Sequence, residues 1–412
     1  MNSNKKICVI GLGYIGLPTS ALLANKGYKV HGVDIVQSTV DTINRGKIHI
    51  IEPELDTFVQ SAVKSGNLIA STKPDFADIF ILAVPTPFYK NSDEYVPNID
   101  YVISATKSIV PFIKEGNIVI LESTSPIGTT HKIQEILEES LSQKDIDTSK
   151  IYISHCPERV LPGHIMRELV QNDRIIGGIT PEATTKTIEF YQTFVDGKVL
   201  STDAKTAEMA KLTENSFRDV NIAFANELSI LCDKFDIDVW ELIKLTNRHP
   251  RVNVLQPGAG VGGHCIAVDP WFIVHSAKQS GIEANLIQSA REVNNYKTEW
   301  AIQKIKNQAL EYELKNNKKP SITIFGLSFK PDIDDLRESP ALYIAQTLKS
   351  ELANFTCVEP NIDINHFDDM RLVCLEEALK SDIKVFLVAH KEFRGLSLDI
   401  NDDILDFCGV LQ

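Results

Sequence analysis

The sequence lacks the features that would mark a disulfide-rich or membrane-spanning protein. None of its 7 cysteines lies in a Cys-x-x-Cys pair, and an odd count spread in this way favours a reducing compartment over a disulfide framework. No apolar run reaches the roughly 18 residues that a transmembrane helix needs. Glycines interrupt the short apolar run after Lys5 and Lys6, so that run does not have the pattern of a signal peptide. We therefore expect a cytoplasmic protein without membrane segments.

An excess of basic charge is also missing. The 42 Lys and Arg residues stand against 55 Asp and Glu residues and give a net charge of −13. Such a chain has no general positive field to attract nucleic acid or an anionic membrane, so neither is an expected partner. A small anionic ligand would have to be held by local Arg and Lys side chains. The 412 residues, 43% of them hydrophobic, suffice for two or three folded domains.

Both ends of the chain alternate short apolar runs with helical stretches. Six runs precede residue 204, at 7–11, 29–34, 78–84, 117–123, 151–156 and 174–178, and three follow residue 316, at 321–326, 355–360 and 382–390. Nearly continuous apolar runs joined by crossover lengths predict parallel sheets covered on both faces. Because residues 204–316 have no clear strand pattern, the expected fold class is α/β. Two Rossmann-like doubly wound domains, 1–203 and 317–412, would be joined by an all-helical region, 204–316.

The first apolar run leads into the glycine pattern Gly11-Leu12-Gly13-Tyr14-Ile15-Gly16. Gly11 suits the tight turn, Gly13 lets the backbone approach a pyrophosphate, and Gly16 allows close packing of helix on strand. Asp34 ends the next strand 18 residues beyond Gly16, where a carboxylate accepts hydrogen bonds from a ribose 2′-hydroxyl and repels a 2′-phosphate. The pattern favours NAD over NADP. The alternative is an ordinary glycine-bearing turn with a solvated aspartate.

Two later strands end in polar, turn-forming segments that carry Thr86 and Thr124. In open α/β sheets the ligand crevice lies outside the carboxyl ends of the strands. Either threonine could line the nicotinamide half of the site. Ordinary turn chemistry explains Thr and Pro at these positions equally well.

The segment from Pro257 to Pro270 is the most informative part of the chain. Four glycines in six positions precede His264 and Cys265, and Asp269 follows four residues later. A thiol in such a permissive backbone, with no apolar run around it, is poorly explained by core packing and is a candidate nucleophile. The remaining cysteines lie in apolar runs and are expected to be buried, except that Cys156 is ambiguous. No second His/Cys pair has ligand spacing, so we expect no metal.

Residues 206–231 predict a largely buried helix, because apolar residues surround most of its circumference. Lys211, Asn215 and Arg218 fall at i, i+4 and i+7 and share one face of that helix. A buried lysine is costly unless it is paired or moves protons in catalysis. The alternative is the solvated face of an amphipathic helix.

Four clusters of charged residues complete the candidates. They lie at Asn247–Arg251, Pro157–Val160, Phe325–Lys330 and Asp334–Glu338. Arg and Lys near strand ends suit a diphosphate or carboxylate ligand, although such clusters are commonly surface charge.

Taken in order, these motifs resemble the UDP-glucose/GDP-mannose dehydrogenase family over nearly the whole chain. The matching stretches are GLGYIGLP, STSPIGT, CPERVLPG, KLTENSFRDVNIAFANE, GVGGHCIAVDPWF and GLSFKPDIDDLRESP. The stretches NRHPRVN and GGHCIAVDPWF are most similar to the branch that oxidises UDP-N-acetyl-D-mannosamine. Ala259 departs from the family pattern, which has proline there, and the C-terminal domain keeps only Gly326 of a glycine fingerprint.

The resemblance implies a four-electron oxidation of a UDP-N-acetylhexosamine at carbon 6, with two molecules of NAD. Lys211 would donate and accept protons, Cys265 would form a thioester, and Asn215 and Lys211 would stabilise the oxyanion. Asp269 and Glu158 would assist proton transfer and activate water, with Thr124 beside the cofactor.

The family pattern also implies the binding residues. NAD would contact Tyr14, Ile15, Asp34, Thr86, Thr124 and Arg337, in addition to the three glycines of the fingerprint. The UDP-sugar would contact Arg159, Val160, Lys211, Asn215, Arg218, His249, Arg251, Gly262 and Lys330. The helical middle would form a homodimer or part of a larger homo-oligomer, and the product would supply a surface polysaccharide.

Three alternatives stay open from the sequence. The sugar could be that of a UDP-N-acetylglucosamine or UDP-glucose 6-dehydrogenase, because pocket shape cannot be inferred from residue spacing. A hydroxyacid-type dehydrogenase would use Lys211 without a covalent step. A non-catalytic nucleotide-binding regulatory protein would keep the fold alone, but the joint presence of Cys265, Lys211, Asn215 and Asp269 argues against it.

Overall fold

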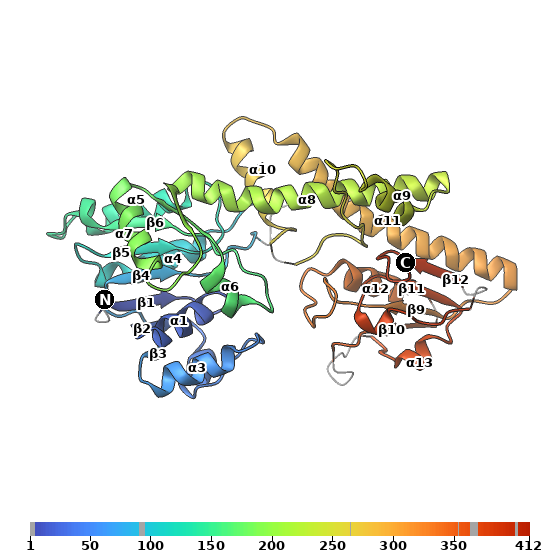
Figure 1. Ribbon diagram of the computed structural model, residues 1–412, viewed down its shortest axis with the longest axis horizontal. Helices are drawn as coiled ribbons and strands as arrows, with labels where there is room; N and C mark the ends of the chain where they lie inside the picture. Colours follow the sequence, from blue (N-terminus) through green and yellow to red (C-terminus); the bar gives the residue numbers. More distant parts are fainter. Residues whose placement is uncertain (1–4, 90–94, 264, 353, 363–369, 400–402) are drawn as a thin grey trace. The chain divides into compact units, whose positions relative to one another are not determined.

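The computed structural model describes residues 5–89, 95–263, 265–352, 354–362, 370–399 and 403–412 (Figure 1). The chain forms two compact units. The first comprises Met1–Thr213 and Trp271–Gly281, and the second comprises Glu214–Pro270 and Ile282–Gln412. No described helix combines the length and the apolar character needed to cross a bilayer. The seven cysteines, all of them among the described residues, form no disulfide with one another.

The first unit is built on an eight-stranded sheet with the order β3-β2-β1-β4-β5-β6-β7-β8. The strands are β1 (Lys6–Ile10), β2 (Lys29–Val33), β3 (Leu68–Ser71), β4 (Ile79–Leu82), β5 (Ile118–Leu121), β6 (Tyr152–His155), β7 (Arg174–Gly178) and β8 (Val199–Asp203). The first six follow the order of doubly wound dinucleotide-binding sheets, with the switch point between β1 and β4. The β6–β7 pair alone is antiparallel.

Helices cover both faces of this sheet because its central strands are apolar on both sides. They are α1 (Gly16–Asn25), α2 (Gln37–Asn44), α3 (Leu55–Lys64), α4 (Asp100–Ile109), α5 (Thr129–Leu141), α6 (Ile165–Gln171) and α7 (Pro181–Tyr191), with 3₁₀ turns at Val110–Phe112 and Thr148–Lys150. Ile7 and Val9 of β1 pack with α1, α3 and α6. Cys8 and Ile10 point the other way and pack with α4 and α5, as the period of two along a strand requires.

The two longest helices, α8 (Ala204–Phe235) and α11 (Asn285–Asn316), have 32 residues each (Figure 1). α8 begins in the first unit and continues into the second. The other helices of this part are α9 (Val239–Thr246) and α10 (Asp269–Gln279). The predicted all-helical character of this region is confirmed for its described residues, because the two sheets take all their strands from outside residues 204–316.

The second unit contains a parallel four-stranded sheet with the order β10-β9-β11-β12. Its elements are β9 (Ile322–Phe325), α12 (Pro340–Glu351), β10 (Phe355–Val358), α13 (Leu375–Ala378), β11 (Ile383–Phe386), a 3₁₀ turn at Lys391–Phe393 and β12 (Asp403–Asp406). Ile322 and Ile324 pack with α11 and α12 on one face. Phe325 and Phe386 pack with α13 on the other.

The predicted α/β class with two Rossmann-like sheets and a helical middle is confirmed. Three edge strands escaped prediction, and each has a physical reason. β3 has only four residues and its apolar Ile69 is exposed, three residues of β8 are exposed, and β12 begins and ends with aspartate. Edge strands need less burial than central strands, so their sequences are weaker signals.

Two burial predictions were wrong. α8 is not buried around most of its circumference, because Phe217, Phe224 and Leu231 are exposed. Cys374 was expected to be buried but is exposed, since it lies at the N-cap of α13.

Candidate active site

The turn between β1 and α1 leaves a strip of backbone open. Gly11 has φ +95°, and a Cβ there would lie 2.4 Å from the carbonyl oxygen of Ala83. A Cβ on Gly16 would overlap the carbonyl oxygen of Gly11, so only glycine permits this packing of helix on strand. A Cβ on Gly13 would meet nothing within 4 Å. The backbone at Gly13 is therefore accessible at the N-terminus of α1, where a pyrophosphate binds in this fold.

Asp34 lies directly after β2 and faces this turn. Its carboxylate accepts hydrogen bonds from the backbone N–H of Leu12, at 3.1 Å, and of Val36, at 2.9 Å. Beside them, Tyr14 is exposed and Ile15 occupies the N-cap of α1. The residues present therefore fit the adenosine ribose and pyrophosphate of a dinucleotide.

The ends of β4 and β5 are joined by side-chain hydrogen bonds. The hydroxyl of Thr86 donates to the carbonyl oxygen of Thr124 at 2.6 Å, and the hydroxyl of Ser123 donates to that of Val84 at 2.7 Å. Both threonines are half-buried. The structure thus brings Thr86 and Thr124 together at the carboxyl ends of the strands.

Glu158 lies in a buried charged cluster that sequence reasoning did not foresee. Arg174 of β7 forms a very short ion pair with its Oε2, and the backbone N–H of Arg159 donates to its Oε1 at 2.7 Å. Next to this pair, Tyr191 donates to Glu122 at 2.6 Å. Burial and the charge of Glu158 raise the pKa of Glu122 to about 7. The one sequence signal for this cluster is that an arginine, Arg174, opens the otherwise apolar run 174–178.

Arg159 and Val160 follow Glu158 in the chain. The guanidinium of Arg159 donates to the carbonyl oxygen of Asp173 at 3.2 Å. Val160 is partly buried and packs against the hydrophobic core between the first sheet and helices α1, α3 and α6. The cluster thereby fixes where the backbone of this segment runs.

The loop from Pro257 to Cys265, the cysteine loop, is held by the two long helices. The side-chain oxygen of Asn226 on α8 accepts from the N–H of Gly258 at 2.9 Å, and the hydroxyl of Thr298 on α11 donates to the carbonyl oxygen of Ala259 at 3.0 Å. Asn226 is itself oriented by Asn294 of α11 at 2.9 Å. The alanine that replaces the family's proline is therefore a fixed, buried part of the loop.

The glycines of this loop allow an approach that no larger residue could make. A Cβ on Gly260 would lie 2.3 Å from the hydroxyl of Thr298. A Cβ on Gly262 would lie 2.4 Å from the carbonyl oxygen of Glu338, and one on Gly263 would lie 2.9 Å from the ring of Phe329. Close packing on both sides therefore holds the backbone of residues 260–263. The thiol of Cys265 is exposed.

Asp269 begins α10 one turn after Cys265. Its backbone N–H donates to the carbonyl oxygen of Cys265 at 2.8 Å, and its buried carboxylate accepts from the amide nitrogen of Asn215 at 2.5 Å. The structure thus links three of the predicted catalytic residues, Cys265, Asn215 and Asp269, within the second unit. His264 lies outside the described residues.

Lys211 lies one turn before Asn215 on α8 and is 9% exposed. None of the described carboxylates forms an ion pair with it. Arg218, predicted on the same face, is exposed and does not share this burial. Asp219 is the buried charge at that turn, and Arg291 of α11 forms an ion pair with it at 2.6 Å.

The remaining predicted contacts are exposed. His249 accepts from the N–H of Arg251 at 3.3 Å in the turn after α9. Lys330 follows β9, and the guanidinium of Arg337 forms a bidentate pair with Asp335.

In the C-terminal sheet, a carboxylate also lies beside the glycine turn, which follows β9 at Gly326. Glu359, at the end of β10, accepts from the backbone N–H of Leu327 at 2.7 Å and of Ser328 at 3.1 Å. Burial raises the pKa of Glu359, but hydrogen bonds from His390 and Leu327 outweigh it and hold the pKa below its usual range. Glu359 thus occupies the position after β10 that Asp34 occupies after β2 in the first unit.

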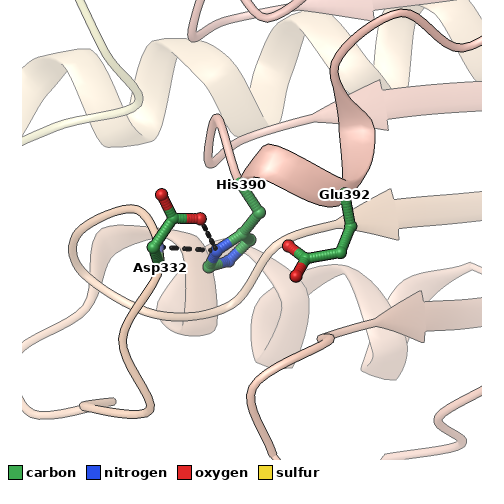
Figure 2. A group of neighbouring side chains, drawn as sticks. All are labelled: Asp332, His390 and Glu392. Carbon is green, nitrogen blue, oxygen red and sulfur yellow. Dashed lines mark hydrogen bonds and ion pairs between the residues drawn. The ribbon is translucent and has the colours of Figure 1, made fainter.

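Asp332, His390 and Glu392 form a cluster whose ligand-type atoms lie within 4.8 Å of one another (Figure 2). His390 Nδ1 accepts from the backbone N–H of Asp332 at 2.9 Å, and Nε2 lies 3.1 Å from the carboxylate of Glu359. Nε2 therefore carries the proton, and the one lone pair of the ring is already used. The cluster supports no metal site.

Comparison with known proteins assigns the chain to one family along its length. The UDP-glucose/GDP-mannose dehydrogenase family is matched by its NAD binding domain at residues 5–195, its central domain at 205–296 and its UDP binding domain at 323–407.

Individual relatives are similar to this chain over most of its length. The UDP-N-acetyl-D-mannosamine dehydrogenase of Campylobacter jejuni is 55% identical over 99% of this chain and 100% of its own length. The NDP-N-acetyl-D-galactosaminuronic acid dehydrogenase of Ralstonia nicotianae is 52% identical over 96% of this chain and 93% of its own. The solved UDP-D-ManNAc dehydrogenase of Pyrococcus horikoshii is 36% identical, with a TM-score of 0.86 over 99% of this chain and 96% of its own.

The domain matches follow the order of the two sheets and the helices between them, and the predicted motifs fall inside them. A nicotinamide dinucleotide is the cofactor that the first domain implies, and a UDP-sugar is the ligand type that the last domain implies. The chain belongs to the UDP-glucose/GDP-mannose dehydrogenase family.

Proposed function

We propose that this chain oxidises UDP-N-acetyl-D-mannosamine at carbon 6 to UDP-N-acetyl-D-mannosaminuronate in the cytoplasm, for surface polysaccharide synthesis. The observation that carries the proposal is the exposed Cys265 on a rigidly packed loop, one turn before Asp269, which in turn holds Asn215. A two-step oxidation needs such a thiol, because the aldehyde must stay bound while spent cofactor is replaced.

NAD is the proposed cofactor, in preference to NADP. Asp34 stands at the ribose end of the turn with its carboxylate fixed by two backbone N–H groups. A carboxylate there accepts from the ribose hydroxyls and repels a 2′-phosphate. When bound, the nicotinamide ring supplies the hydride acceptor for both oxidations.

In the first oxidation, Lys211 would take the proton of the carbon-6 hydroxyl as the hydride leaves that carbon, which gives the aldehyde. Its burial without a carboxylate partner among the described residues supports this role, because such a charge is costly in a purely structural position. The amide of Asn215, one turn further along α8, would stabilise the developing oxyanion.

In the second oxidation, the Cys265 sulfur would add to the aldehyde carbon and give a thiohemiacetal. Loss of the second hydride and of the hydroxyl proton would leave a thioester, and water would release the thiol and the uronate. Asp269 would activate this water, and the hydrogen bond from Asn215 supports this role because it fixes the orientation of the carboxylate. Glu158, whose two oxygens are engaged by Arg174 and the N–H of Arg159, would act by holding the 157–160 segment.

The proposed sugar contacts come from the exposed polar residues of the second unit and from the segment after β6. Lys330 and the pair His249 and Arg251 would contact the UDP-sugar. Gly262, which packs closely against Glu338 and Phe329, would contact it through its backbone. For Arg337 to contact NAD, it would have to share its pairing with Asp335.

The choice of N-acetylmannosamine rests on the motif NRHPRVN together with the names of close relatives. Because two relatives of similar identity carry different sugars in their names, the sugar needs a direct test. Purified protein should be assayed for NADH release with UDP-N-acetylmannosamine, UDP-N-acetylglucosamine, UDP-N-acetylgalactosamine and UDP-glucose.

We expect two NADH per molecule of UDP-N-acetylmannosamine and the highest kcat/KM for this sugar. One NADH per sugar would rule out the thioester route and favour a simple alcohol dehydrogenase. Binding of NAD and UDP-sugars without any NADH release would favour a regulatory protein.

We also infer a homodimer formed through α8. Phe217, Phe224 and Leu231 are 69%, 54% and 45% exposed and repeat every seven residues, which puts them on one stripe. Exposed apolar stripes of this kind are typical of interfaces, and a second copy would cover the stripe across a two-fold axis.

Replacing Phe224 by glutamate should convert the dimer to monomer, because it would place charges at the centre of the stripe. Light scattering after size-exclusion chromatography measures the mass directly. Ile51→Glu is the matched control, since Ile51 is 76% exposed and lies outside α8, and this variant should stay dimeric. A wild-type monomer, or a dimer unaffected by Phe224→Glu, would contradict the inference.

A further inference from the structure

A cavity lies in the second unit, and Cys265 is not among its lining residues. It has a volume of about 230 Å³ and is bounded by the end of α8, by α9 and α11, and by β12. The rings of Trp240, Trp300 and Phe407 form its aromatic walls. Pro257, the first residue of the cysteine loop, also lines it.

Lys297 is the unusual group of this cavity. It is 2% exposed, its Nζ donates to the hydroxyl of Ser229 at 2.7 Å, and the same nitrogen lies 3.9 Å from the ring centre of Trp300. Burial lowers its pKa to about 7. A buried ammonium held by a hydroxyl and a ring, without a described carboxylate partner, lacks the counter-ion that such groups normally have.

The acidic groups around the cavity are engaged elsewhere. Asp233 forms a very short ion pair with Lys304. Asp238 accepts from the N–H of Trp240 at 2.9 Å. Asp406 accepts from the backbone N–H of Cys408 and Gly409, at 3.0 and 2.8 Å. None of the three neutralises Lys297.

We infer that this cavity is a binding site for a small organic anion with an apolar or aromatic body, whose acidic group pairs with Lys297. The anion would supply the missing counter-ion, and its body would replace water between the two indole rings and Phe407. This site is separate from the proposed dehydrogenase site and does not depend on that activity.

Benzoate and its uncharged analogue benzamide test the inference, with binding measured by isothermal titration calorimetry on the full chain at pH 7. Benzoate should bind at least tenfold more tightly than benzamide, because only benzoate forms the ion pair. Lys297→Met should abolish that preference. The control Lys306→Met should retain it, since Lys306 lies on the same helix but pairs with Glu351 outside the cavity.

The pH dependence gives a second readout. The anion binds the protonated lysine, so affinity is greatest below the pKa of the free side chain and falls as pH rises above it. Between pH 7 and 9, the Kd of benzoate should rise by about tenfold or more. Cys232, whose pKa burial raises, and the engaged groups Asp233, Asp238, Asp406 and Lys304 are the other titratable groups that line the cavity.

Lys297→Arg should bind benzoate with a Kd that stays constant over this range, because a guanidinium keeps its charge. Equal affinities for benzoate and benzamide in the wild type would overturn the inference. So would benzoate binding that survives Lys297→Met in a variant whose Tm shows that it is folded.

Discussion

Replacing Cys265 by alanine should abolish uronate formation, with a fall in kcat for the complete reaction of about a thousandfold or more. The thiol is the group proposed to keep the aldehyde carbon bound between the two hydride transfers. Cys8, Cys156, Cys232 and Cys357 are buried, and burial raises the pKa of each of these thiols. Mass spectrometry of the product and the NADH count together measure the effect.

Cys374→Ala is the matched control for this variant. Cys374 is the other exposed cysteine, but it caps the short helix α13 and lies outside the cysteine loop. Its replacement should leave two NADH per sugar and full uronate yield. If the Cys265 variant still made two NADH per sugar, the thioester step would be removed from the mechanism.

Replacing Lys211 by methionine should lower kcat by about 10²- to 10⁴-fold and leave KM for the UDP-sugar nearly unchanged. Methionine has a similar length and keeps the packing of this buried position but cannot move a proton. The loss should already be present in the first hydride transfer, because the hydroxyl proton must leave with the hydride. Stopped-flow measurement of the first NADH separates this step from the later ones.

Lys205→Met is the control, because Lys205 is an exposed lysine at the start of the same helix. It should behave as the wild type. A Lys211 variant that retained its first-turnover rate would show that the lysine is a structural residue. A rise in KM with unchanged kcat would instead show that it only binds the sugar.

The central strands and the glycine turn were predictable because their signals are local. A strand buried on both faces must be apolar throughout, as in Ile7–Ile10, and the turn that follows needs Gly11 and Gly16 because a Cβ would clash. The edge strands β3 and β8 were not predictable in this way, because half of each faces solvent.

Among the candidate site residues, the sequence singled out Cys265 and Lys211 by chemical type and by their place in a motif. It did not indicate Arg174 as the partner of Glu158, 16 residues away. It also missed Asn226, Thr298 and the packing around the glycines of the loop. These contacts join residues 32 or more positions apart in the chain, so no local pattern carries them.

The sequence by itself determined the fold class, the family and the dinucleotide turn, and it singled out Cys265 as the candidate nucleophile, since each depends on residue type within a short stretch. The tertiary structure alone decided which charges are buried and with what partners. It pairs Asn215 with Asp269, leaves Lys297 without a described carboxylate partner and exposes the Phe217–Leu231 stripe. The physical reason is that burial and pairing depend on neighbours that folding brings from distant parts of the chain.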